Sequence, residues 1–167
     1  MHKLLALLVF GALAVPLSQA QAAPAAGTPN LAGTWNIDIA KSDFGQAPAP
    51  TKQSEVITQN GNDFTFQITQ VSDYGTPNYT FSVKADGTET PFPANAMPAD
   101  APFKILSTSA KWDGPALVLT QKTSFQDSPG TLTATYTLSP DGKVLTKDSK
   151  IAASMGEFDM KAVYDKQ

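Results

Sequence analysis

The sequence contains no cysteine and no arginine, and its single histidine is the second residue. Without cysteine the chain has neither disulfides nor a thiol nucleophile, and without a histidine beyond His2 it lacks the usual catalytic base and zinc ligand. All 12 basic residues are lysines, and 15 acidic residues bring the net charge to −3. Such a chain is a poor match for nucleic-acid phosphates, which attract basic surfaces. These absences predict a protein that is not an enzyme, binds no nucleic acid and holds no metal or cofactor.

These absences do not exclude catalysis by a pair of carboxyl groups, one acting as an acid and the other as a base. Glu157 and Asp159 are two residues apart on a predicted strand and therefore share its outer face. An acid–base pair needs two carboxyl groups in different environments. Two outward carboxylates favour a solvent-exposed, solubilising role instead.

Long apolar runs are also rare, and the one run present opens the chain. Leu4 to Val15 is uncharged and is followed by Pro16 and the small-residue site Ala20-Gln21-Ala22. A membrane-spanning helix needs roughly 20 apolar residues, more than this run provides. The pattern predicts a signal peptide over residues 1–22, cleaved on export to the periplasm or the cell exterior, and no membrane span.

The rest of the chain divides into a short leader and one domain. Residues 23–30 are rich in Ala and Pro without a pattern, which predicts a flexible leader. Residues 31–167 alternate apolar and polar side chains, the period of a strand with one buried face. Turn residues recur along this part, including the hairpin signal Asn60-Gly61-Asn62 and a predicted turn at Ser128-Pro129-Gly130.

Apolar side chains are expected to share one face of each strand, as with Trp35, Ile37 and Ile39, or Leu106 and Ala110. The pattern predicts an all-β, antiparallel up-and-down barrel of about 8–10 strands, because closure removes the exposed edges of an open sheet. The expected strands are 34–41, 53–59, 63–71, 77–84, 88–92, 104–112, 116–126, 131–139, 143–152 and 157–165.

The first expected strand carries Gly33-Thr34-Trp35, which resembles the opening of lipocalins and fatty-acid-binding proteins. The resemblance implies a lipocalin-like barrel, a calycin, in which Gly33 and Trp35 are structural residues. It also implies that a late basic residue packs over Trp35, and lysine is the only type available for this. The segment from Gly33 to Gly45 is similar as well to the opening of small secreted bacterial proteins.

The end of the chain supports the same resemblance. Fatty-acid-binding proteins close with Arg-x-Tyr-x-Lys, and Tyr164 and Lys166 match the Tyr and Lys. In that family the Arg and Tyr hold a ligand carboxylate, but Ala162 stands in the place of the Arg. The resemblance therefore implies a bound apolar molecule without implying the carboxylate site.

Together, the signal peptide and a barrel of this kind predict an exported, monomeric protein that binds a small neutral hydrophobic molecule in the barrel interior. An apolar pocket with a few polar groups is the usual form of such a site. The alternative is a structural or protein-interaction module whose barrel is filled by its own side chains. The expected ligand-binding residues are Phe66, Phe81, Tyr136, Tyr164 and Gln121.

One connection is unusually rich in proline, with four prolines between residues 91 and 103. Proline cannot donate to a strand ladder, so a regular strand is not expected there. Its apolar residues Phe92, Met97 and Phe103 either gate a barrel mouth or pack down on the barrel surface.

Overall fold

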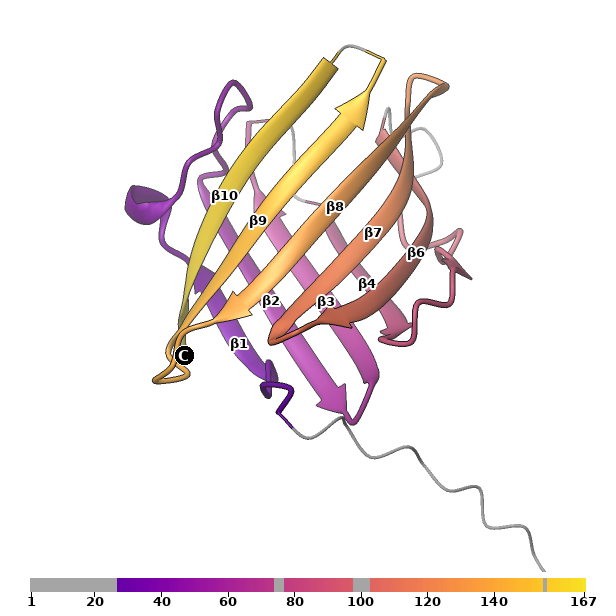
Figure 1. Cartoon of the computed structure of the whole chain (residues 1–167). Helices are drawn as coiled ribbons and strands as arrows, with labels where there is room; N and C mark the ends of the chain where they lie inside the picture. The colour runs from indigo at the N-terminus through magenta and orange to yellow at the C-terminus, as the bar shows by residue number, and fades with distance from the viewer. Residues whose placement is uncertain (1–26, 74–76, 98–102, 155) are drawn as a thin grey trace, which may run out of the picture.

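In the part of the chain that the structure describes, the alternating segments form ten antiparallel strands that curve into a nearly closed barrel (Figure 1). The computed structural model describes residues 27–73, 77–97, 103–154 and 156–167. The predicted signal peptide and most of the predicted leader lie outside the described residues. The strands are β1 (Gly33–Ile37), β2 (Lys52–Asn60), β3 (Asp63–Val71), β4 (Asn78–Lys84), β5 (Thr90–Pro91), β6 (Phe103–Asp113), β7 (Ala116–Phe125), β8 (Ser128–Leu138), β9 (Val144–Ala153) and β10 (Gly156–Lys166).

Pairing follows chain order, which confirms the predicted all-β, up-and-down topology. The sheet order is β4-β3-β2-β1-β10-β9-β8-β7-β6-β5, so the first and last strands pair and close the chain on itself. The two ends of this sheet meet where β4 lies beside β6, and the described residues form no hydrogen-bonded ladder there. Phe92 fills this seam, with its ring centroid 5.5 Å from that of Phe81 and 6.0 Å from that of Tyr79.

The first strand is shorter than the sequence suggested. It ends at Ile37, and Ile39–Lys41 form a single 3-10 turn, η1. The Asp38 side chain accepts a hydrogen bond from the Lys41 amide and pairs with the Lys41 ammonium at 2.7 Å. Because this local capping competes with the sheet ladder, the chain leaves the strand there. Ile39 is therefore exposed, and the expectation that it shares a face with Trp35 was wrong.

Two further expectations fail for local reasons. The turn expected at residues 128–130 lies instead at Gln126 and Asp127, both with positive φ, while Ser128 already begins β8. In β6 the register shifts between Ile105 and Ser107. This bulge turns the intervening Leu106 outward, and 52% of its surface is exposed.

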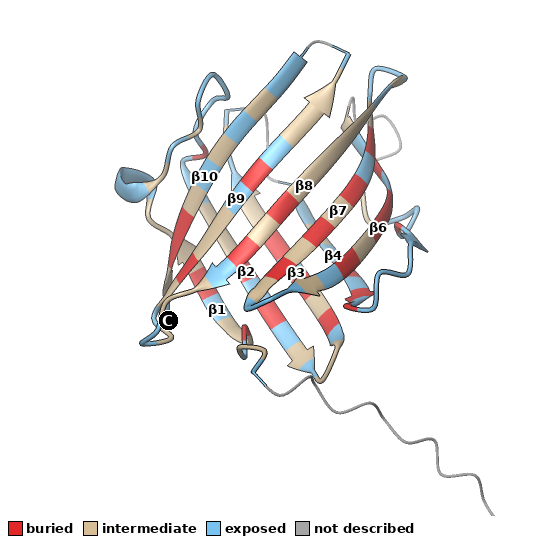
Figure 2. Ribbon diagram, in the orientation of Figure 1, coloured by how far each residue is buried: buried red, intermediate tan, exposed pale blue. Residues whose placement is uncertain are grey.

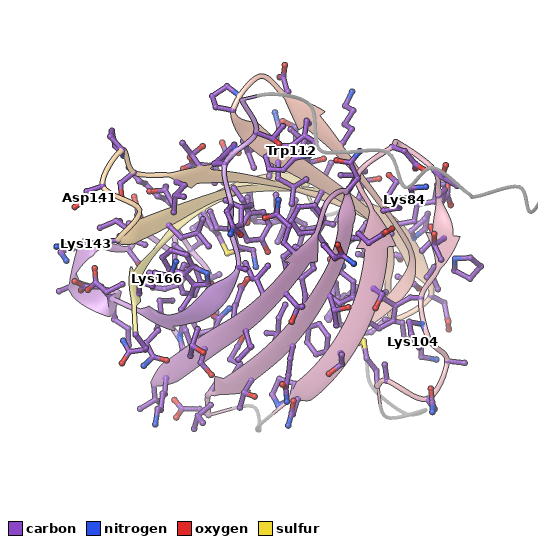
Figure 3. All side chains as sticks on the ribbon, turned by 90° about the horizontal axis from the view of Figure 1, so that it is seen from below. Lys84, Lys104, Trp112, Asp141, Lys143 and Lys166 are labelled. Carbon is purple, nitrogen blue, oxygen red and sulfur yellow. The ribbon has the colours of Figure 1, made fainter. Side chains whose placement is uncertain are left out.

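The lower end of the barrel in Figure 1, where the C-terminus lies, is filled by side chains. Figure 2 shows buried residues recurring along the strands, and Figure 3 shows the interior from this end. Trp35 is fully buried, donates from Nε1 to the Leu31 carbonyl at 2.9 Å, and has the Lys166 ammonium 5.1 Å from its ring centroid. The basic residue expected over Trp35 is thus Lys166, placed there by the pairing of β1 with β10.

Candidate functional site: a two-part cavity in the barrel

Two adjacent cavities are lined by strand residues near the β7–β8 and β9–β10 turns. These turns lie at the upper end of the barrel in Figure 1. The volumes of the two cavities are about 330 and 310 Å³, within the lower range of sites for small molecules. Ala47, Ile151 and Met160 line both cavities, so the two share a wall. Ala47 belongs to the segment that follows η1, which crosses this end of the barrel and is bridged to β10 through Asp43 and Lys161.

The first compartment, called here the apolar cavity, is lined mainly by hydrocarbon. Phe125, at its margin, is 38% exposed, so the cavity reaches the protein surface. Strand alternation accounts for the lining, because inward positions near the ends of β7, β9 and β10 contribute it. Its principal residues are Phe103, Phe125, Ile151, Phe158 and Met160.

The second compartment, called here the polar cavity, carries hydrogen-bonding groups. Its lining includes Gln53, Gln70, Tyr79, Lys147 and Tyr164, together with apolar residues of β8, β9 and β10. Among the described residues that line the two compartments, Lys147 is the only one with a charged side chain.

The Lys147 ammonium is held by a buried carboxylate, that of Glu55. Lys147 Nζ donates to Glu55 Oε1 at 2.7 Å, and the two side chains are 15% and 0% exposed. The same oxygen accepts hydrogen bonds from the Tyr164 hydroxyl at 2.8 Å and from Gln53 Nε2 at 3.3 Å. The Tyr136 hydroxyl donates to Oε2 at 3.1 Å. A fully buried carboxylate thus has four donors, as burial of a charge requires.

These contacts set the protonation of the network. Burial lowers the pKa of Lys147, but the Glu55 carboxylate outweighs it, and the net pKa is raised above its usual value. Burial, reinforced by the same carboxylate, holds the pKa values of Tyr136 and Tyr164 well above their usual range. Near neutral pH the lysine is therefore an ammonium and both tyrosines are neutral hydrogen-bond donors.

The structure distributes the predicted ligand-binding residues over two regions. Tyr164 lines the polar cavity, and Tyr136 lies behind it, bonded to Glu55. Phe66 and Phe81 stack with centroids 5.1 Å apart within the packed core. Gln121 is buried and donates to Thr108 Oγ1 at 3.3 Å, outside both cavity linings. The ligand-binding role of all five stays a prediction.

The proline-rich connection also lies against this region. Phe92 is buried, and Met97 and Phe103 are partly buried against the core. Phe92 packs down as the second interpretation expected, whereas Phe103 lines the apolar cavity. Residues 98–102 of the connection are outside the described part of the chain.

Glu55 and Lys147, the pair that organises the polar cavity, are not among the residues predicted from the sequence to bind a ligand. Their spacing does contain the signal, because Glu55 is two residues from Ile57, and Lys147 is two residues from Leu145. Both neighbours are buried, and a period of two places the charged residues on the same inner face.

Within the described ranges the carboxylates form no group of three or more able to hold a metal ion. Helices long and apolar enough to cross a bilayer are likewise missing from that part of the chain.

Comparisons with known proteins agree with the architecture. No protein-family model matches the sequence, and no curated protein matches it either. Among solved structures, the chain is similar to a zebrafish ileal bile-acid-binding protein complexed with cholic acid, at 17% identity and a TM-score of 0.53, covering 82% of this chain and 98% of that one. A Schistosoma mansoni fatty-acid-binding protein in complex with arachidonic acid matches at 11% identity and a TM-score of 0.47, over 82% of this chain and 96% of that one. At this identity the likeness shows the fold alone, which is a nearly closed antiparallel barrel similar to that of the bile-acid-binding protein.

Proposed function

We propose that this chain is an exported binding protein that carries a small, neutral, hydrophobic molecule in the upper half of its barrel. The observation that carries the proposal is the pair of adjoining cavities, one mainly apolar and reaching the surface, the other lined by hydrogen-bonding groups as well. An apolar chamber with a few directed polar groups is the form of most small-molecule sites.

Three further features support the proposal. The mature chain has no cysteine and no histidine for common catalytic chemistry, which agrees with a passive role. The solved structure of similar fold is described as a bile-acid-binding protein complexed with cholic acid, which supports a small-molecule ligand in a barrel of this shape. The predicted signal peptide supports an extracytoplasmic site of action.

The site can be tested by filling it. Ile151 lines both cavities, so Ile151→Trp should occupy the space where they adjoin. Ala152 is the next residue on β9 and faces the opposite side of the sheet, so Ala152→Trp is a matched control. With the neutral dye Nile red as the probe, the wild-type protein and the control should enhance its fluorescence at one molecule per chain, while Ile151→Trp should bind it at least about tenfold more weakly.

The alternative function, a protein-interaction module, predicts a different result. If the wild type and both variants respond to the dye alike, the cavities are not the binding site. Native mass spectrometry of the protein from its own compartment, with N-terminal sequencing, tests export and cargo together. A mature chain beginning near residue 23 with a bound small molecule is expected, whereas a chain that begins at Met1 contradicts export.

A further inference from the structure

Glu55 neutralises the positive charge of Lys147 inside the barrel. Its carboxylate accepts hydrogen bonds from Lys147, Tyr164, Tyr136 and Gln53. Among the described residues lining the cavities, Lys147 is the one cation, and it is paired with the fully buried anion Glu55. No arginine exists anywhere in the sequence to supply a second cation.

An anionic ligand entering the polar cavity would therefore be a second buried negative charge facing a single lysine. A buried charge without its own counter-ion is strongly unfavourable, because it loses its hydration without a compensating attraction. A neutral ligand meets no such cost. The internal carboxylate thus discriminates by charge, although it does not itself need to touch the ligand.

The polar cavity nevertheless has hydrogen bonds to offer. An ammonium has three donors, and Lys147 gives one of them to Glu55. Tyr79 and Gln70 also line this cavity, and their hydroxyl and amide groups are of the kind that donates and accepts hydrogen bonds. These groups suit a ligand whose polar end is an uncharged oxygen, with its hydrocarbon in the apolar cavity.

We infer that Glu55 is a specificity-determining residue: it acts as a built-in anion that makes the cavity accept neutral amphiphiles with a hydroxyl or carbonyl end and reject their carboxylate counterparts. The inference rests on the proposed function, because it concerns the ligand of the same cavities. It predicts that removal of the Glu55 charge frees Lys147 and inverts the preference.

The test compares ligands that differ at one end. Dodecanol, methyl dodecanoate and dodecanoate have a hydrocarbon chain of similar length, and only the last is charged. Isothermal titration at neutral pH should show that the wild-type protein binds the alcohol and the ester about a hundredfold more tightly than the carboxylate. Glu55→Gln keeps the shape and an acceptor oxygen but removes the charge, and it should bind dodecanoate at least about tenfold more tightly than dodecanol.

Two variants serve as controls. Glu157→Gln removes the same charge from an exposed pair with Lys150 on the outer surface, so it should leave the wild-type preference unchanged. The double variant Glu55→Gln/Lys147→Met should lose the affinity for dodecanoate that Glu55→Gln gains, because no cation remains in the cavity.

The outcomes separate this inference from the function on which it rests. Equal wild-type affinity for dodecanoate and its methyl ester overturns the inference, even if Glu55→Gln does not fold. An unchanged preference in a folded Glu55→Gln protein overturns it as well. Absence of binding by all three ligands and by Nile red, in contrast, refutes the proposed function itself.

Discussion

Replacement of Lys147 by Met should destabilise the protein far more than the loss of one ion pair normally does. The Nζ–Oε1 distance of 2.7 Å gives a Coulomb attraction of about 6 kcal/mol at an effective dielectric constant of about 20. Burial of the two ions costs several kcal/mol each, so the intact pair contributes little net stability. Lys147→Met keeps the cost of the fully buried Glu55 and removes the attraction. We expect a loss of about 3–5 kcal/mol, a large share of the roughly 5–15 kcal/mol typical of a domain.

The double variant Glu55→Gln/Lys147→Met should recover most of that loss. It contains no buried charge, and the glutamine oxygen still accepts from the hydroxyls of Tyr136 and Tyr164. Its remaining cost is the adjustment of a few neutral hydrogen bonds, about 1–2 kcal/mol. The double variant is therefore expected to be more stable than the single Lys147→Met variant.

Urea denaturation followed by circular dichroism measures these free energies of unfolding. Lys150→Met provides a control on the same strand, because its partner Glu157 is exposed and the pair is worth at most about 1 kcal/mol. The reasoning is refuted if Lys147→Met lies within about 1 kcal/mol of the wild type, or if the double variant is as unstable as Lys147→Met.

Three other properties follow from the structure. The pKa values of Tyr136 and Lys147 are raised in the folded state, so the free energy of unfolding should be unaffected by the titration of these groups below roughly pH 10. Above that pH it should fall by about 1.4 kcal/mol per pH unit for each group. Tyr136→Phe should make the fall shallower, and a free energy of unfolding independent of pH in that range contradicts the buried network. Gln126 and Asp127 have φ values of 47° and 66°, so Gln126→Asn with Asp127→Gly should raise stability by about 1 kcal/mol, seen as a higher Tm; a lower Tm would show that their side chains matter more than the turn. Trp35→Ala should lower the free energy of unfolding by about 3–5 kcal/mol, because the indole is fully buried. A loss below about 1 kcal/mol would contradict its role as a core residue at the lower end of the barrel.

The sequence alone determined the class of fold and most of the strands. A period of two in apolar residues is a local property, and so is the punctuation by glycine, asparagine and proline. The strand expected over residues 63–71 coincides with β3, and the hairpin at Asn60-Gly61-Asn62 forms as predicted. The predicted first strand was too long because a short-range contact, the capping of η1 by Asp38, competes there with the sheet ladder.

Only the tertiary structure decided where the interior is full and where it is hollow. The sequence marks which side chains face inward, but whether they meet across the barrel depends on strand tilt and register, which are set by the whole closed sheet. Phe66 and Phe81 pack in the core, and Ile151 and Met160 line the cavities, a distinction that a period of two does not make. The ligand-binding role of Phe66 and Phe81 stays a prediction. The pairing of Glu55 with Lys147 is likewise invisible locally, because the two residues are 92 positions apart and meet only when β2 and β9 face each other across the barrel.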